Sequence, residues 1–542
     1  MTDQDQKTVQ LNEKTLDGSS PPQSDVEVGE ILEDHGADYG LQRRLGSRHL
    51  TMVGIGSSIG MGLWLGSGTS LTRGGPASIF LGYVLSGTVV WAVNQSIGEL
   101  AVMYPLPSAF VRWSSKFIDP SMGFALGWAT FFSSPITMAN EIQGLCTVLG
   151  FWTDKVPIPA WVTIWAIVII VINIGAVNIW GEFEVTASSI KLFWIVVVII
   201  SCIVISAGGG PKGDAIGFRY WNEMPFINGF KGFLRVMPTC IFAMSGAESS
   251  GIVAAEAGNP LKAVPAAVRS IWVRLSLFYV IGALMVTITV SPKDPNLFGG
   301  SGVNASPYVI AFRNAGVEPL AHIMNAVIFV SVLSTGSISP LLGSRTILGL
   351  GNLKMAPKIF AKCDKSGRPW GGLLLVFIIG WPLAYLNVNH TASEVFTWLS
   401  NLTSLFTLFT WGLICLSHIR FRAAWKAQGH SVSELPWKTK TFPFAAWWGL
   451  VWCMILIVVE FYLAVWPLHA KSSAQTFFAN YVSVILIILL YFGARFHYKG
   501  AWFIAAKDID LREGRRYYAA RKEKKGNFIK RAIDGMMGGG SF

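Results

Sequence analysis

The chain has 542 residues, of which 52% are hydrophobic and 14% charged, with 43 Lys and Arg against 31 Asp and Glu. Soluble domains carry about 25% charged residues. Here the two chain ends, 1–48 and 494–542, hold 32 of the charged residues, which leaves only about 9% for residues 49–493. This composition excludes collagen, a coiled coil, a disordered chain and a soluble enzyme, and it predicts an all-α polytopic membrane protein.

Residues 1–48 are acidic and poor in aromatic side chains, and they lack the apolar core of a signal peptide, so we expect a disordered N-tail. A spanning helix needs about 20 apolar residues, and about twelve such segments follow. They are 50–71, 77–103, 121–148, 160–178, 186–207, 237–257, 271–290, 318–341, 370–386, 394–417, 446–466 and 477–496. We therefore predict a transmembrane domain over 49–496 and a basic C-tail over 497–542.

Lys and Arg are concentrated in alternate loops, chiefly before the first segment and after the second, sixth, eighth and tenth. The positive-inside rule then places both tails in the cytosol. The net charge of +12 reflects this topology, so nucleic acid is not an expected partner. The partners expected are the lipid bilayer and a small-molecule substrate. The scattered cysteines and histidines suggest no metal site, cofactor or enzyme activity.

The first segment contains more glycine than a continuous helix tolerates, since each interior glycine costs about 1 kcal/mol. Gly56 and Gly60 fit a GxxxG packing motif, but the glycines surround the helix instead of lining one face. A local break explains the pattern better. The sixth segment resembles the first in this respect, because Ser245, Gly246 and Gly251 surround an ionisable Glu248.

Interrupted helices at corresponding positions of two halves indicate an inverted-repeat transporter, and here each begins a five-helix unit. Unwinding frees N–H groups at the start of one half-helix and C=O groups at the end of the other. The N–H groups suit a carboxylate and the C=O groups suit an ammonium. These breaks therefore predict a binding site for a small zwitterion such as an amino acid.

Several motifs resemble those of fungal amino-acid permeases, the yeast amino acid transporter branch of the amino acid–polyamine–organocation superfamily. The first segment reads I-G-S-S-I-G-M-G-L-W-L-G-S-G (55–68), close to the family's I-G-G-T-I-G-T-G-L-F-V-G-S-G. Further matches are G-E-L-A-V-M-Y-P (98–105), F-T-W-G-L-I-C-L-S-H-I-R-F-R-A-A-W-K-A-Q-G (409–429) and E-L-P-W-K (434–438). The resemblance covers about residues 40–510.

The resemblance implies a LeuT-type fold of two inverted five-helix repeats, about 49–207 and 233–417, with extra helices over about 446–496. It also implies proton-coupled amino-acid import at the plasma membrane by alternating access. The carboxylate is expected on the N–H groups of Met61 and Gly62, and the amino group near Ser58, Phe242 and Ser245. The full expected site is Gly56, Ser57, Ser58, Gly60, Met61, Gly62, Phe242, Ala243, Met244, Ser245 and Gly246.

The proton-coupling candidates are Glu248, Lys191 and Glu141. Glu248 has either a substrate or proton role, or a structural hydrogen bond across the break. Lys191 either replaces a sodium ion, as in sodium-independent relatives, or extends to the membrane interface. Glu141 is a candidate to line the cavity. Of the remaining carboxylates, Glu99, Glu182 and Glu184 are expected to be gate or solvated residues, and Glu460 to be peripheral.

Departures from the family pattern concern the substrate, because Met244 stands where Phe or Gln is common. With Phe242 it suggests an apolar pocket and a neutral side chain on the substrate. In family members, lysines like Lys7 and Lys14 accept ubiquitin, so ubiquitin-ligase machinery is a candidate partner. The alternative function is an amino-acid sensor or receptor on a permease scaffold, with little or no transport.

Overall fold

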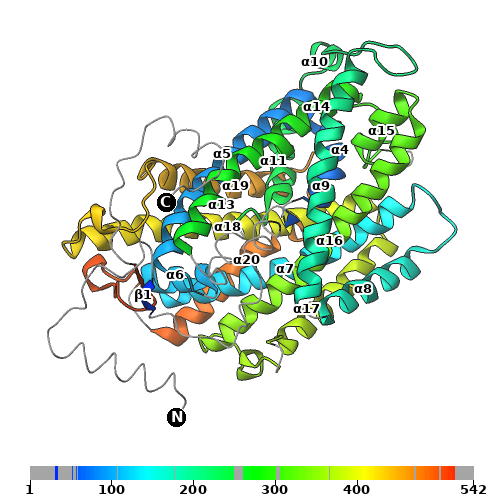
Figure 1. Ribbon diagram of the computed structural model, residues 1–542. Helices are drawn as coiled ribbons and strands as arrows, with labels where there is room; N and C mark the ends of the chain where they lie inside the picture. The colour runs from blue at the N-terminus through cyan, green and yellow to red at the C-terminus, as the bar shows by residue number, and fades with distance from the viewer. Residues whose placement is uncertain are drawn as a thin grey trace, which may run out of the picture.

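The structure is a computed structural model that describes residues 31–34, 52, 56–57, 59–106, 108–175, 177–248, 260–300, 305–364, 367–468, 471–499 and 502–518. Helices dominate these residues (Figure 1). In the first half they are α3 (Met61–Trp64), α4 (Gly66–Gly74), α5 (Pro76–Met103), α6 (Ala109–Phe117), α7 (Pro120–Leu149), α8 (Ile158–Ile174), α9 (Val177–Ser206), α10 (Arg219–Glu223) and α11 (Gly229–Met244).

The second half begins with α13 (Pro260–Arg274), which continues through the π-helical turn η1 (Leu275–Ile281) into α14 (Gly282–Thr289). The later α-helices are α15 (Pro307–Asn314), α16 (Glu318–Asn352), α17 (Trp370–Ala384), α18 (Ala392–Ala427), α19 (Phe444–Val465) and α20 (Ala474–Tyr498). Short 3-10 turns are η2 (Lys358–Ala361), η3 (Tyr385–Val388), η4 (Val432–Glu434) and η5 (Ala506–Asp508), and the strands are β1 (Ile31–Asp34) and β2 (Arg516–Tyr518).

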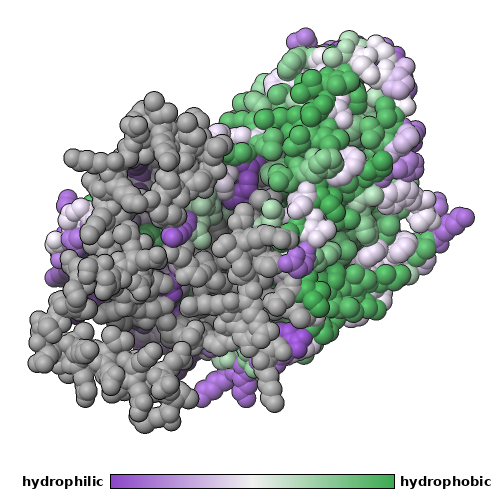
Figure 2. Space-filling view, viewed as in Figure 1, coloured by the Kyte–Doolittle hydropathy of each residue, from purple (hydrophilic) through white to green (hydrophobic). Residues whose placement is uncertain are grey.

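Within the described residues, eight helices are long and apolar enough to cross a membrane, and α8 is a shorter apolar helix. Figure 2 shows a continuous hydrophobic surface over α9 and the helices beside it, where Phe193 is 63% exposed. An apolar surface of this kind is suited to lipid rather than water. The prediction of an all-α polytopic membrane protein is confirmed, whereas the twelve-helix count and the inverted repeat stay predictions.

Several helices extend beyond the apolar segments expected from hydropathy. Helix α9 begins at Val177 instead of 186, α16 ends at Asn352 instead of 341, and α18 ends at Ala427 instead of 417. A 35-residue helix such as α16 is about 50 Å long, well beyond the 30 Å hydrocarbon core. Hydropathy detects only the part of each helix that lies in lipid.

Helix α7 lies at the centre of the bundle, where it packs against α16, α17, α18 and α20 (Figure 1). Small residues allow these close approaches, as is typical of membrane helices. At Gly380 of α17, an added Cβ would lie 2.8 Å from the carbonyl oxygen of Pro135 in α7. Helix α6 and strand β1 lie at one end of the molecule, and helices α10 and α15 lie at the opposite end (Figure 1).

Glu99 is not the solvated residue that its position near a helix end suggested, and a role as a gate stays a prediction. Its carboxylate is fully buried and accepts hydrogen bonds from Arg422 at 2.9 Å and from the Thr439 N–H at 3.1 Å. His418 Nε2 lies 3.1 Å from the same carboxylate. A buried carboxylate needs such partners to offset its lost hydration, so this cluster ties α5 to α18.

Part of each predicted tail is folded against the helices. Strand β1 from the N-terminal region pairs antiparallel with β2 from the C-terminal region. Residues 502–518 contact the ends of α5, α6 and α18: the Tyr104 hydroxyl donates to the Leu511 carbonyl at 2.9 Å, and Gln428 donates to the Ile509 carbonyl at 2.7 Å. Lys7 and Lys14 lie outside the described residues, as does the C-tail beyond 518.

Candidate functional site

The first interruption lies at the end of the glycine-rich segment. Gly60 has an extended backbone (φ −138°, ψ −152°), and helix α3 begins at the next residue, Met61. The Ile59 carbonyl turns towards α16, where the hydroxyls of Ser331 and Thr335 each donate to it at 2.9 Å. Side chains from another helix therefore satisfy a carbonyl that a continuous helix would bond internally.

The second interruption ends helix α11. The helix stops at Met244, Ser245 is extended, and Gly246 has a φ of +93°, in the region that favours glycine. An added Cβ on Gly246 would lie 2.7 Å from the Ser57 carbonyl oxygen, so the available space also requires glycine. The helix interruption that the sequence predicted is therefore present at Ser245–Gly246.

The two interruptions are in direct contact. An added Cβ on Gly62 would lie 2.7 Å from the Cα of Ala243, so the two backbones approach as closely as glycine permits. The Ser57 hydroxyl donates to the Gly246 carbonyl at 3.2 Å. Segments about 190 residues apart in the sequence thus form one polar centre inside the bundle. Ser58, also expected there, lies outside the described residues.

Glu141 of α7 reaches the start of α3. Its carboxylate is 1% exposed and accepts from the Met61 N–H, with distances of 3.1 and 3.3 Å to its two oxygens. The backbone N–H of Trp64 donates to the Gly60 carbonyl at 3.3 Å. Of the first four N–H groups of α3, those of Gly62 and Leu63 are then left without a partner in the described part of the chain. The start of α3 thus holds the carboxylate of Glu141 on the Met61 N–H, and binding of a substrate carboxylate at Met61 and Gly62 stays a prediction.

Lys191 is buried in the middle of α9. Its Nζ donates to the Gly56 carbonyl at 2.9 Å and to the Ser334 hydroxyl at 2.8 Å. Ser334 in turn donates to the carboxylate of Glu184 at 2.7 Å. The side chains of Lys191 and Glu184 are both fully buried, so the expectations of a lysine at the interface and a solvated Glu184 are wrong. The longer α9 is the reason, since it places Lys191 well inside the helix.

Glu248 lies at the second interruption. Its Oε2 accepts from the Gly246 N–H at 3.0 Å and from the indole N–H of Trp411 in α18 at 3.1 Å. These bonds form the structural link across the break that the sequence offered as one alternative. Glu248, Ser245 and Gly246 are all partly exposed, so a substrate or proton role for Glu248 stays open as well.

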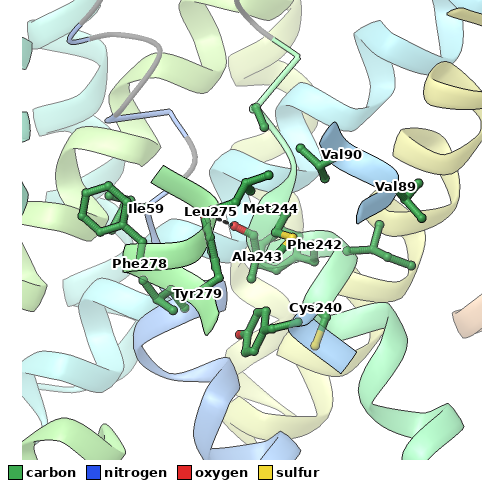
Figure 3. Packing of buried hydrophobic residues seen from close by; sticks show 14 of the residues in the cluster. Ile59, Val89, Val90, Cys240, Phe242, Ala243, Met244, Leu275, Phe278 and Tyr279 are labelled. Carbon is green, nitrogen blue, oxygen red and sulfur yellow. Dashed lines mark hydrogen bonds between the residues drawn. The ribbon is translucent and has the colours of Figure 1, made fainter. Parts of the chain in front are cut away.

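The apolar side chains at the end of α11 point in different directions. Figure 3 shows Met244 packed among Val89, Val90 and other buried side chains, and its Cε lies 3.9 Å from the position of a Cβ added to Gly87. Phe242 packs edge-on against Phe396, with ring centroids 5.8 Å apart. Met244 thus faces the α5 core, which weakens the argument for a neutral substrate from this residue.

Several residues of the site were not predicted from the sequence. Ser331, Ser334 and Thr335 come from α16, Trp411 from α18, and Tyr279 donates to the Ala243 carbonyl at 2.8 Å. The sequence does hold a signal for the α16 residues. Residues 331–339 read S-V-L-S-T-G-S-I-S, which is unusually rich in hydroxyl groups for an apolar helix. Trp411 and Tyr279 carry no such local signal.

The chain is similar in sequence to known amino-acid permeases over most of its length. The amino acid permease family model matches residues 49–502. The general amino-acid permease GAP2 of Candida albicans is 40% identical over 505 residues, 92% of this chain and 85% of that protein. The general amino-acid permease GAP1 of Saccharomyces cerevisiae is 37% identical over 487 residues, 88% and 81% of the two chains.

A third relative is the cationic amino acid transporter 1 of Schizosaccharomyces pombe, which is 36% identical over 485 residues, 88% of this chain and 82% of that protein. The family match at residues 49–502 includes both helix interruptions. Together with the relatives, this match shows that the chain belongs to the amino acid permease family, a family of multi-pass membrane transporters and not of enzymes.

Proposed function

We propose that the protein imports amino acids across the plasma membrane by proton symport with alternating access. The observation that carries the proposal is the contact between two helix interruptions, each lined by backbone polar groups, inside an otherwise apolar bundle. Irregular backbone at membrane depth is tolerated where it surrounds a binding cavity. The family membership supports amino acids as the substrate class.

The zwitterion would bind with its two charged groups on the two interruptions. Its carboxylate would accept from the N–H groups of Gly62 and Leu63 at the start of α3, where the helix dipole is positive. Its ammonium would donate to carbonyl groups around Phe242 and Ser245, at the end of α11. Both contacts are made to the α-carboxylate and α-ammonium groups of the substrate, which all amino acids share. Selectivity is therefore left to the pocket that holds the substrate side chain.

Glu141 offers a direct route to proton coupling. Its carboxylate occupies the Met61 N–H, which belongs to the same cluster of donors that would hold the substrate carboxylate. Two anions at one helix start repel each other, so protonation of Glu141 would favour substrate binding. Proton and amino acid would then bind together, as symport requires. Lys191 would fix the opened segment by bonding to the Gly56 carbonyl, in the place of a sodium ion.

Uptake in reconstituted vesicles tests the coupling. Glu141→Gln removes the titratable group, so we expect accumulation driven by a pH gradient to fall at least tenfold while exchange of labelled amino acid persists. Glu182→Gln is the matched control, because Glu182 is exposed on α9. Accumulation by the Glu141→Gln variant equal to wild type would remove Glu141 from the coupling, and accumulation that follows sodium would overturn proton symport.

A panel of radiolabelled amino acids in a permease-deficient fungal strain would identify the substrate. Amino-acid binding to the purified protein without flux would instead support the sensor or receptor. The cytosolic placement of both tails and control of turnover through ubiquitin at Lys7 and Lys14 remain parts of the proposal. Replacing both lysines by Arg should slow removal from the plasma membrane, and unchanged turnover would contradict that role.

A further inference from the structure

A groove of about 680 Å³ lies between α8 and the α17–η3 segment, away from the helix interruptions. Its lining is almost wholly apolar and includes Ile170, Phe377 and Ile378, with Tyr385 at one end. Leu374 and Ile378 are 60% and 58% exposed, so the groove opens onto the outer face of the bundle. In a membrane protein that face is in contact with lipid.

Hydrogen bonds join the two helices at both ends of the groove and leave the space between them open. At one end Arg368 donates to the carbonyl of Ile174, the last residue of α8. At the other end the hydroxyls of Thr163 and Tyr385 are 2.7 Å apart. The groove is therefore held open by contacts at its ends and is not simply a gap between loosely packed helices.

The length of the groove matches one leaflet of the bilayer. Its lining runs along α17 from Trp370 to Pro382, which is about 18 Å at 1.5 Å per residue. Half of a 30 Å hydrocarbon core is about 15 Å. Trp370 is 40% exposed at the first turn of the helix, where tryptophan is typical of the headgroup level. A single acyl chain that enters beside Trp370 would reach the middle of the membrane.

Two lysines lie in or next to the turn that packs on the first residues of α17, near the Trp370 end of the groove. Lys358 begins η2, and Lys362 follows it, and both side chains are exposed. The turn packs on α17, since a Cβ added to Gly371 would lie 3.4 Å from the Ile359 carbonyl oxygen. Ile359 is 65% exposed between the lysines, which is the pattern of a turn lying on the membrane surface.

Arg368 is fixed at the same place. Its Nε donates to Asp364 at 2.9 Å, and its guanidinium lies over the Trp370 ring at 5.5 Å. The bond to Asp364 pairs the guanidinium with a carboxylate, and the bond to the Ile174 carbonyl joins α8 to the start of α17 at this end of the groove. A guanidinium has five N–H donors, and the planar group is well suited to a phosphate.

We propose that this groove binds an anionic phospholipid, with one acyl chain between α8 and α17 and its headgroup beside Lys358, Lys362 and Arg368. The apolar groove alone would suit any acyl chain, a sterol or a helix of a second copy. The cluster of cations at its headgroup end distinguishes an anionic lipid from these. A Lys or Arg near an anionic membrane surface contributes about 1 kcal/mol of attraction, and we expect a similar contribution, about fivefold in binding, from each cation here.

Photocrosslinking in nanodiscs tests the site. The full chain is reconstituted in phosphatidylcholine with a small fraction of phosphatidylserine that carries a diazirine on its acyl chain, and adducts are located by peptide mass spectrometry. We expect adducts in α8 and α17, and about 25-fold less labelling of these peptides in the double variant Lys358→Gln/Lys362→Gln. Lys426→Gln, an exposed lysine at the end of α18, should leave labelling unchanged.

A second variant separates the groove from the headgroup site. Ile378→Trp fills the groove and should lower labelling of α17 at least fivefold, whereas Val458→Trp on α19, 65% exposed, should not. Three outcomes would each overturn the proposal. They are equal labelling by the matching phosphatidylcholine probe, displacement of phosphatidylserine by a sterol, and loss of labelling when a second copy of the chain covers the groove in a dimer. None of these readouts depends on transport, so the result stands apart from the function proposed above.

Discussion

Lys191 links the opened first segment to the helices around it. Its ammonium donates to the Gly56 carbonyl in that segment and to the Ser334 hydroxyl of α16, and Glu184 supplies the compensating negative charge. Lys191→Met removes the ammonium and keeps a side chain of similar length. We expect uptake to fall at least tenfold and the free energy of unfolding to fall by about 3 kcal/mol, because a buried carboxylate then loses its counter-charge.

The double variant Lys191→Met/Glu184→Gln separates the role of the lysine in transport from its role in stability. Removing both charges should restore the thermal midpoint of the purified protein, which a fluorescence melt in detergent measures. Uptake should remain low, because the Gly56 carbonyl still lacks its donor. Recovery of both uptake and stability would mean that Lys191 only compensates the charge of Glu184.

The sequence indicates which residues of the site are unusual but not which residues they meet. Lys191 and Glu141 stand out as charges within apolar segments, whereas Ser334 lies 143 residues from Lys191 and has no charge to attract notice. Glu460, expected to be peripheral, is 4% exposed and accepts from Ser404 at 2.7 Å. Position along a helix predicts membrane depth, but the direction in which a side chain points depends on packing between helices.

At the scale of elements, the breaks were predictable because their cause is local. Glycine and serine weaken a helix wherever it packs, so a cluster of them marks an interruption before any partner is known. The bounds of α9, α16 and α18 were not predictable in this way. Their ends carry polar residues such as Arg422, which hydropathy excludes and which the folded protein pairs with Glu99.

Gly62 is a point of close contact between α3 and the end of α11. An added Cβ would lie 2.7 Å from Ala243 Cα and 2.9 Å from the Phe242 ring, and backbone cannot yield as a side chain can. Gly62→Ala should therefore push the two interruptions apart, lower uptake at least tenfold and cost about 1–3 kcal/mol of stability through overpacking. Uptake of labelled substrate and a thermal melt measure the two effects.

Gly493 of α20 supplies the control. A Cβ there would have nothing within 4 Å, and alanine is the better helix former by about 1 kcal/mol. Gly493→Ala should leave uptake unchanged and raise the thermal midpoint slightly. Normal uptake by Gly62→Ala would show that the close approach of α3 and α11 is not needed for transport.

At the scale of the whole molecule, the folded part of the chain extends beyond the last membrane helix. Composition predicted a basic C-tail over 497–542, but Arg516 is 2% exposed and belongs to the strand paired with β1. Net charge does not reveal which cations are enclosed by the protein itself. The segment 502–518 therefore behaves as a part of the fold that covers the ends of α5, α6 and α18.

Two truncations test this extension of the fold. Ending the chain after Tyr518 keeps every contact that the segment makes with the described residues, so the thermal midpoint should equal that of the full chain. Ending it after Ala501 removes Ile509 and Leu511, each 3% exposed, and should cost about 3–6 kcal/mol because two buried apolar side chains are lost. The full-length variant Leu511→Asp should shift the midpoint in the same direction. Equal midpoints for the two truncations would mean that residues 502–518 lie on the helix ends without stabilising them, and the tail would then begin where composition placed it.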